Sequence, residues 1–344
     1  MVTEIRQSDS RMMKKVEALL EAEGITRDKH LDYTCGILDD DYNVIATGSA
    51  FGNTLRCFAV SKAHQGEGLL NEVISHLMDY QAQRGNFHLF LYTKPQSAKF
   101  FGDLGFAEIA RVDDALVFME NRKNGFPGYL AELAKTRREG QSAAIVMNAN
   151  PFTLGHRYLV ETAAGENDTL HLFILSEDAG PIPAAVRKRL VMEGVADLGN
   201  VVCHDTGPYL ISKATFPGYF LKSEESVLSA QARLDTRIFA RIAAALGVTR
   251  RYVGEEKASL VTGIYNDIMA AELPRHGVEC RIIPRKTADG AAPISASTVR
   301  KAIQDGKLDA LAGLVPETTL RYFLSDEAAP VVAAIRREKD VIHY

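Results

Sequence analysis

The residues best suited to chemistry lie where an apolar stretch is followed by NANPFTLGHRYLVE. Thr153 can cap a helix that begins there, and His156 then falls near the third helical position. The first turn of a helix has free N–H groups and a partial positive charge, which favour phosphate. An imidazole beside them can donate a hydrogen bond to a phosphoryl oxygen in a transition state. Gly155 lets a ligand approach and Pro151 stiffens the loop, although an ordinary capped βα turn fits these residues equally well.

A second candidate site is PISASTVRKAIQDG, near the other end of the chain. We predict that Ser297 caps this helix, which places Arg300 at the third helical position. Ser295 and Thr298 add hydroxyls to the same turn, and hydroxyls with a guanidinium suit phosphate oxygens. Taken alone, the segment also fits a serine-capped helix with a solvent-facing arginine.

Both segments belong to an alternation of apolar strands and helices, which predicts a parallel sheet with helices on both faces. In such doubly wound sheets, helix starts converge above the carboxyl ends of the strands, where ligands bind. Gly254 and Glu255 end one of these strands. The predicted strands are 143–147, 170–175, 201–204, 251–253 and 279–283, and the predicted helices are 154–164, 184–196, 226–246, 265–273 and 298–304.

The first part of the chain shows a different pattern, of mixed α and β type. Strands are predicted at 33–38, 44–51, 54–60, 88–93 and 115–119, and helices at 12–22, 69–83 and 97–104. A stretch with Gly, Pro and clustered charge follows. We therefore predict an N-terminal α+β domain at 1–125, a linker at 126–140 and a C-terminal doubly wound domain at 141–344.

Composition limits the classes of function. The chain has 344 residues, of which 46% are hydrophobic, as expected for a globular protein of two domains. A formal net charge of −4 gives no general attraction to nucleic acid or to anionic membranes. Four widely spaced cysteines, no signal peptide and no long apolar run predict a cytoplasmic protein outside the membrane. The histidine spacing predicts no zinc site.

The two motifs together, T-x-G-H and I-S-x-S/T-x-x-R, resemble those of cytidylyltransferase-like nucleotidyltransferases. Further segments, SED, ATFPGYFL, VGEE, IYN and IPRK, occur in the order seen in the citrate lyase ligase family. The resemblance covers most of residues 141–344. It implies that ATP, with Mg²⁺, activates acetate as acetyl-adenylate. The acetyl group then passes to the thiol of the CoA-like prosthetic group on the citrate lyase acyl-carrier subunit.

The resemblance also implies roles for individual residues. Thr153 and His156 would hold the α- and β-phosphates, and Gly254 and Glu255 would lie near the base or ribose. The remaining implied nucleotide contacts are Asn148, Asn150, Pro151, Phe152, Gly155, Arg187, Ile294, Ser295, Ser297, Thr298 and Arg300, with Lys213 as a further phosphate candidate. Thr153 stands where many members of the superfamily carry histidine. No general base is assigned, because acetate is already a carboxylate at neutral pH.

The N-terminal domain resembles GNAT acetyltransferases, in which a turn of this kind binds the pyrophosphate of acyl-CoA. Gln65, Gly66 and Gly68 match the Q/R-x-x-G-x-G/A motif, whereas Leu70 stands where Gly or Ala is usual. Phe101 stands where the family often carries a tyrosine general acid, and it has no proton to give. The domain is therefore expected to have lost acetyl transfer, and its turn could still bind the CoA-like arm of the lyase prosthetic group.

Other functions remain open from the sequence. The main alternative is an adenylyltransferase that acts on a phosphopantetheine or mononucleotide acceptor. A GNAT acetyltransferase with a regulatory nucleotide module and a non-catalytic nucleotide sensor are further alternatives. Phe216, Tyr219 and Phe220 could form a small apolar acetate pocket, or they could equally be core residues.

Overall fold

The chain forms two compact units, and one of them takes residues from two separate parts of the sequence. The computed structural model describes residues 1–178, 180–210, 216–221, 223–255, 260–288 and 292–338. Unit 1 comprises Met1–Gly128 and Pro217–Ala230, and unit 2 comprises Tyr129–Phe216 and Gln231–Tyr344. Within the described ranges, no helix is long and apolar enough to cross a membrane.

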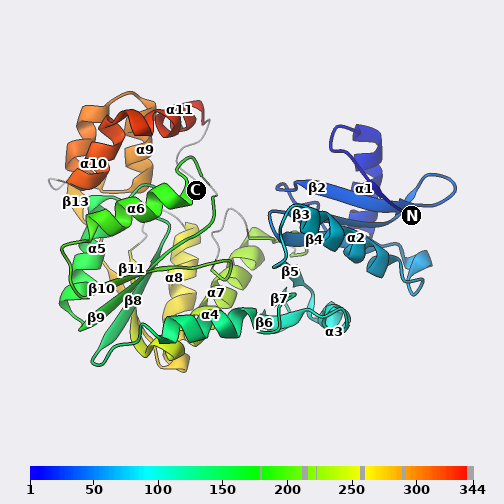
Figure 1. Ribbon diagram of the computed structural model, residues 1–344, viewed down its shortest axis with the longest axis horizontal. Coiled ribbons are helices and arrows are strands. Elements are labelled where there is room, and N and C mark those ends of the chain that lie inside the picture. Colours follow the sequence, from blue (N-terminus) through cyan, green and yellow to red (C-terminus); the bar gives the residue numbers. More distant parts are fainter. Residues whose placement is uncertain (179, 211–215, 222, 256–259, 289–291, 339–344) are drawn as a thin grey trace. The chain divides into compact units, whose positions relative to one another are not determined.

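Unit 1 is built on a mixed seven-stranded sheet in the order β1-β2-β3-β4-β5-β7-β6 (Figure 1). The paired strands run antiparallel except β4 and β5, which are parallel. The strands are β1 (Val2–Glu4), β2 (Tyr33–Leu38), β3 (Val44–Phe51), β4 (Thr54–Val60), β5 (Phe90–Thr93), β6 (Ala107–Val112) and β7 (Leu116–Glu120). The helices are α1 (Ser10–Ala22), the 3₁₀ turn η1 (Lys62–His64), α2 (Leu69–Gln83) and α3 (Pro95–Asp103).

Two apolar clusters cover this sheet, one with α1 and one with α2. Leu55 of β4 belongs to the α2 cluster, whereas Cys57 and Ala59 belong to the α1 cluster. These residues would share one face of a regular strand. The register of the β3–β4 pairing shifts opposite these residues, and Cys57 has φ 54°. The resulting bulge turns the rest of β4 toward α1.

The segment Pro217–Ala230 completes unit 1 although it lies far along the chain. The Thr26 backbone N–H donates to the Tyr219 carbonyl at 2.7 Å, and the Tyr219 hydroxyl donates to the Tyr92 carbonyl at 3.5 Å. Tyr219 packs against the α1 cluster, and burial raises the pKa of its hydroxyl. Tyr219 is therefore a partly buried side chain that packs onto the core of unit 1. The predicted linker falls mostly within α4 (Gly125–Ala134), which begins in unit 1 and ends in unit 2.

Unit 2 contains a five-stranded sheet in the order β10-β9-β8-β11-β12, with every pairing parallel. The strands are β8 (Ser142–Met147), β9 (Thr169–Ile174), β10 (Val201–Asp205), β11 (Val248–Gly254) and β12 (Glu279–Ile283). The chain adds β9 and β10 on one side of β8 and then crosses to add β11 and β12 on the other side. The order therefore reverses between β8 and β11, which is where doubly wound sheets open a ligand crevice. The α/β fold class with a parallel sheet is confirmed.

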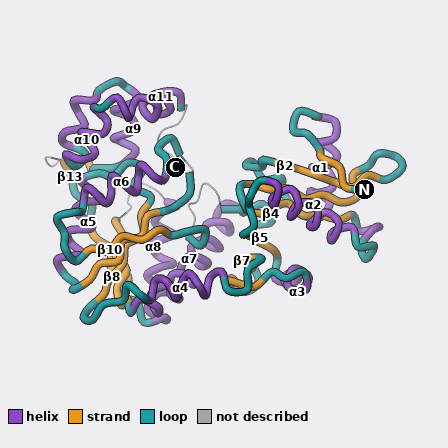
Figure 2. Tube along the Cα trace, in the orientation of Figure 1, coloured by secondary structure: helices purple, strands orange, loops and turns teal. Residues whose placement is uncertain are grey.

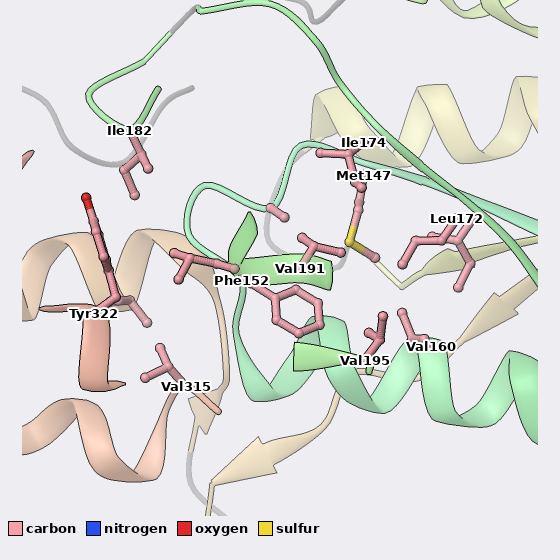
Figure 3. Packing of buried hydrophobic residues seen from close by; sticks show 14 of the residues in the cluster. Met147, Phe152, Val160, Leu172, Ile174, Ile182, Val191, Val195, Val315 and Tyr322 are labelled. Carbon is pink, nitrogen blue, oxygen red and sulfur yellow. The ribbon is translucent and has the colours of Figure 1, made fainter. Parts of the chain in front are cut away.

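Helices pack on both faces of this sheet (Figure 2). The helices that lie wholly or mostly in unit 2 are α5 (Leu154–Gly165), α6 (Ala184–Gly194), α7 (Glu224–Leu246), α8 (Leu260–Glu272), η2 (Leu273–His276), α9 (Ala296–Gln304), η3 (Leu308–Gly313), α10 (Glu317–Leu324), η4 (Asp326–Ala328) and α11 (Ala329–Arg337). A two-stranded hairpin of β13 (Thr287–Ala288) and β14 (Ala292–Pro293) precedes α9. One face carries the cluster around Phe152, Leu172 and Val191 (Figure 3). On the other face, Arg251 of β11 lies over the ring of Phe239 in α7.

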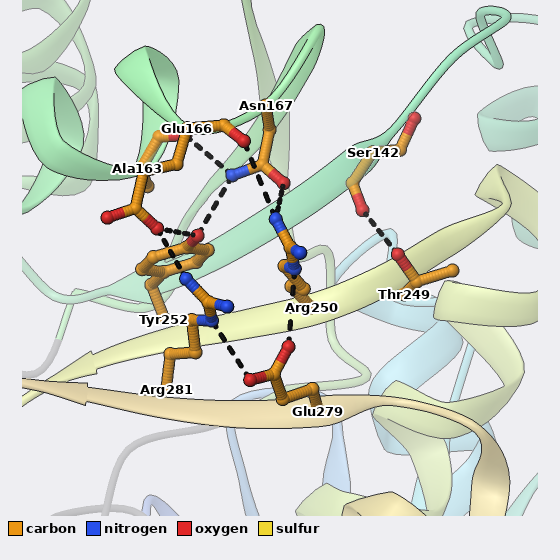
Figure 4. Close-up of polar contacts among 9 residues, drawn as sticks. All are labelled: Ser142, Ala163, Glu166, Asn167, Thr249, Arg250, Tyr252, Glu279 and Arg281. Atoms are coloured by element: carbon orange, nitrogen blue, oxygen red, sulfur yellow. Dashed lines mark hydrogen bonds and ion pairs between the residues drawn. The ribbon is translucent and has the colours of Figure 1, made fainter.

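A polar network fixes the C-terminal end of α5 to β11 and β12 (Figure 4). The Tyr252 hydroxyl donates to Glu166 Oε2 at 2.6 Å, and Arg281 pairs with the same oxygen at 2.6 Å. Asn167 donates to the Tyr252 hydroxyl at 3.0 Å. Because α5 is a continuous helix, these contacts at its C-terminal end also help to position its N-terminus, which carries the first motif.

Candidate active site at the carboxyl ends of the strands

The first motif folds as a capped helix start directly after β8. Thr153 is the N-cap of α5, and its hydroxyl accepts a hydrogen bond from the His156 backbone N–H at 3.2 Å. His156 is the third helical residue and completes a capping box through its side chain. The predictions that Thr153 caps the helix and that His156 lies in its first turn are both confirmed.

The hydrogen bonds of His156 determine which ring nitrogen carries the proton. Nδ1 lies 3.1 Å from the Thr153 backbone nitrogen, which can only donate, and 2.9 Å from the Thr153 hydroxyl. Nδ1 must therefore be an acceptor, and the proton of the neutral ring lies on Nε2. Burial, with the nearby charges of Arg285 and Arg300, lowers the pKa of His156 to about 4. At neutral pH, His156 is an uncharged ring that can donate from Nε2.

Arg187 of α6 holds the loop between β8 and α5 in place through hydrogen bonds. Arg187 is buried, and its Nη1 donates to the carbonyl and the side-chain oxygen of Asn148 at 2.6 and 2.7 Å. Its Nε donates to the Ile182 carbonyl at 3.2 Å, and burial lowers its pKa. The structure thus places Arg187 as a support of the loop. In the same loop, Phe152 is fully buried and stacks against His156, with ring centroids 5.9 Å apart.

The helix of the second motif begins two residues earlier than predicted. Ser295, and not Ser297, is the N-cap of α9, because its hydroxyl accepts from the Thr298 backbone N–H at 3.1 Å. Arg300 is therefore the fifth helical residue and not the third. The Ser295 hydroxyl also lies 2.9 Å from that of Ser297 and 2.8 Å from that of Thr298, so the three hydroxyls form one cluster at the helix start.

The two motifs lie against each other at the end of β8. A Cβ on Gly155 would come within 2.8 Å of the Ile294 carbonyl oxygen, so glycine is needed there for the approach of the second segment. This differs from the prediction, which assigned the space to a ligand. Arg300 is buried, and its Nη1 donates to the carbonyl of Asn150, which precedes Pro151 in the first loop.

The ends of β11 and β12 contribute the other side of the site. The Glu255 backbone N–H donates to the Ile283 carbonyl at 2.8 Å, and the Gly254 carbonyl accepts from Asn266 of α8 at 3.2 Å. Arg285, just after β12, donates through Nε to the Glu255 carbonyl at 2.7 Å. Gly254 and Glu255 therefore lie beside Arg285, whose charge also lowers the pKa of His156.

Arg285 and Lys286 were not predicted as site residues. The Lys286 carbonyl accepts from the Ile294 N–H at 3.0 Å, so this basic pair connects β12 to the second motif. Two consecutive cations directly after a predicted strand were a signal that could have identified them. Lys213 lies outside the described residues. In the described part of the chain, no cluster of three or more His, Cys, Asp or Glu side chains is arranged to hold a metal.

The turn that resembles a coenzyme-binding motif lies in unit 1, between β4 and α2. Gly66 and Gly68 have φ of 91° and 79°, so the turn needs glycine at both positions. Gly68 is the N-cap of α2 and offers no side chain to its N–H groups. Phe101 is buried in the α2 cluster, as a core residue.

Most of the chain is similar in sequence to known proteins. Residues 142–323 match the family model of the citrate lyase ligase C-terminal domain. Citrate (pro-3S)-lyase ligase of Haemophilus influenzae is 36% identical over 322 residues, which cover 92% of this chain and 96% of that protein. The enzyme of the same name from Klebsiella pneumoniae is 39% identical over 294 residues, covering 84% and 86%.

Solved structures resemble parts of the chain. A GNAT-family acetyltransferase from Staphylococcus aureus covers 36% of this chain and 99% of its own, with 14% identity and a TM-score of 0.31. Pantothenate synthetase from Thermus thermophilus covers 50% of this chain and 65% of its own, with 16% identity and a TM-score of 0.35. The family model and the close relatives show that the chain belongs to the citrate lyase ligase family of enzymes.

Proposed function

We propose that this protein is an ATP-dependent ligase that activates acetate and acetylates the prosthetic-group thiol of the citrate lyase acyl-carrier subunit. AMP and pyrophosphate are the other products. The observation that carries the proposal is the convergence of the two motifs at the end of β8. There the neutral His156, the hydroxyl cluster of α9 and the cation Arg285 surround the start of α5. Family membership supports the choice of substrates.

The groups at this site match the needs of a triphosphate. The N–H groups at the starts of α5 and α9 favour anions, and the cluster of Ser295, Ser297 and Thr298 offers hydroxyl donors. Arg285 and Arg300 supply positive charge, and Mg²⁺ would neutralise further charge on the phosphates. Because the backbone N–H and the hydroxyl of Thr153 are both bonded to His156, we assign Thr153 the role of orienting the imidazole.

The reaction follows in two steps. A carboxylate oxygen of acetate attacks the α-phosphorus of ATP, and the bond to the bridging oxygen of pyrophosphate breaks. The His156 Nε2–H donates to a phosphoryl oxygen as charge builds up there. In the second step, the thiol sulfur attacks the acyl carbon, the bond to the AMP oxygen breaks, and the thiol proton is released to solvent. The need for ATP and a reduced thiol places this activity in the cytoplasm.

Carboxylate-dependent exchange of labelled pyrophosphate into ATP tests the proposal. We expect exchange with acetate, and weaker exchange across a panel of larger acids. Acetylation of the purified acyl-carrier subunit should then depend on ATP and acetate together. Exchange that needs a mononucleotide or phosphopantetheine acceptor and ignores acetate would favour the adenylyltransferase alternative. Membership of the ligase family weighs against that alternative.

The protonation state of His156 gives a direct test of the geometry. In ¹⁵N NMR spectra, the ring should be neutral with its proton on Nε2 from pH 8 to well below 6, with a pKa of about 4. Its signals can be assigned by their absence from His156→Asn. Since the unfolded state takes up this proton near pH 6.5, the stability due to the depressed pKa is complete above 6.5 and decreases as the pH falls toward 4. A midpoint near 6.5 in the folded protein would contradict the described environment.

A further inference from the structure

A cavity of about 360 Å³ lies at the carboxyl ends of β9 and β10, beside the first turn of α6. Its walls are partly apolar and partly polar. The lining residues are Ile174, Leu175, Ser176, Ala184, Ala185, Lys188 and Asp205.

The cavity adjoins the first motif but lies on the other side of it from β11 and β12. The Leu175 backbone N–H donates to the Met147 carbonyl at 3.1 Å, so this wall residue lies beside the end of β8. Neighbouring strands are about 4.8 Å apart, which puts the ends of β9 and β10 about one and two strand spacings from the end of β8. A ligand in the cavity can therefore reach a group held above the end of β8.

Hydrogen bonds fix the part of the cavity wall that lies at the ends of β9 and β10. The Ser176 N–H donates to the Thr206 hydroxyl at 3.1 Å, and the Gly207 N–H donates to the Ser176 hydroxyl at 3.1 Å. These contacts tie the residues after β9 to those after β10. The Ser176 hydroxyl remains at the cavity wall as a polar group for a ligand.

The charges of the lining discriminate between possible ligands. Lys188 and Asp205 form an ion pair at 2.6 Å, so the one cation of the lining is matched by its one anion. A carboxylate or phosphate would lose hydration here without gaining net positive charge from the side chains, and the Ala184 N–H at the start of α6 already donates to Asp178 Oδ1 at 2.5 Å. A neutral chain of methylene and amide groups suits the apolar walls of Leu175, Ala184 and Ala185 together with a few polar contacts.

We propose that this cavity holds the thiol-bearing arm of the acyl-carrier subunit during the second step, an inference that rests on the proposed function. The acyl-adenylate is held above β8, β11 and β12, and the arm approaches from the side of β9 and β10. The thiol thus reaches the acyl carbon without passing the nucleotide. The site is specific for a neutral, flexible chain that ends in a thiol.

Ala185→Trp tests the assignment, because Ala185 is an exposed wall residue and a large side chain there fills the cavity without entering the core. Pantetheine and the acyl-carrier subunit serve as thiol acceptors. We expect acetate-dependent pyrophosphate exchange, which does not use the arm, to stay within about twofold of wild type, and acetyl transfer to either thiol to slow about tenfold or more. Met192→Trp, at an exposed position of the same helix outside the lining, is the matched control and should leave both half-reactions unchanged.

The results of this experiment decide whether the cavity holds the arm. Normal transfer by folded Ala185→Trp overturns the assignment. So does a raised KM for acetate in the exchange reaction, which would make the cavity an acetate site, or the loss of both half-reactions at an unchanged melting temperature. Absence of exchange in the wild type would count against the proposed function and not against the cavity. If the tryptophan prevents folding, Ala185→Met gives the same test with a smaller side chain that suits a helix.

Discussion

Replacing His156 by alanine should slow acetate-dependent pyrophosphate exchange about a hundredfold or more, since one donor to a developing charge contributes ~3 kcal/mol. The affinity for ATP should change much less, because the Nε2–H bond is proposed to strengthen in the transition state. The rate and the KM for ATP are both obtained from initial exchange rates over a range of ATP concentrations.

Two further variants separate chemistry from helix capping. His156→Asn retains a short side chain that can accept from the Thr153 N–H, but it places no donor where Nε2 lies. We expect it to melt like the wild type and to be as slow as the alanine variant. His276→Ala removes an exposed histidine of unit 2 and should have no effect. Full activity of His156→Asn would reduce His156 to a capping residue.

Arg300→Lys should raise the KM for ATP about tenfold or more, although both residues carry a positive charge. The buried guanidinium of Arg300 donates to the Asn150 carbonyl and so joins α9 to the loop of the first motif. A lysine ammonium has a different reach and lacks the planar fork, so it cannot keep this contact and face the phosphates together.

ATP binding measured by calorimetry, with melting curves of each variant, provides the test. Arg321→Lys is the matched control, since Arg321 is exposed on α10 and, among the described residues, makes only a long ion pair with Glu317 at 4.0 Å. That substitution should leave ATP binding unchanged. If Arg300→Lys binds ATP as tightly as the wild type, Arg300 does not belong to the nucleotide site.

Most elements of both units could be predicted because their apolar residues repeat with the period of a strand or a helix. Strands 33–38, 44–51, 54–60 and 279–283 and helix 69–83 have the predicted bounds. β1 was missed because it has only three residues and no buried face, and β6 because a register shift between Glu108 and Ala110 interrupts its alternation. The last helices, α10 and α11, were not predicted because they have only 8 and 9 residues, so each shows little more than about two turns of the helical repeat.

The site was predictable where local rules decide the structure. A threonine before a helix caps it wherever the helix packs, so Thr153 and His156 could be placed from the sequence. In the second motif, two serines compete for the cap, and the sequence offered no means to choose Ser295. The contacts of Arg187 and Arg285 depend on carbonyl groups brought near by the fold, which no local pattern encodes.

The membership of Pro217–Ala230 in unit 1 has a consequence for synthesis. When Gly128 leaves the ribosome, unit 1 still lacks Tyr219, which will later pack against its α1 cluster. About 90 more residues must be added, which takes roughly 5–18 s at typical elongation rates. Unit 1 cannot complete its core on emergence, as N-terminal domains usually do, and the α1 face stays partly uncovered meanwhile. The nascent chain should therefore be most exposed to proteolysis at this face until residue 230 has emerged.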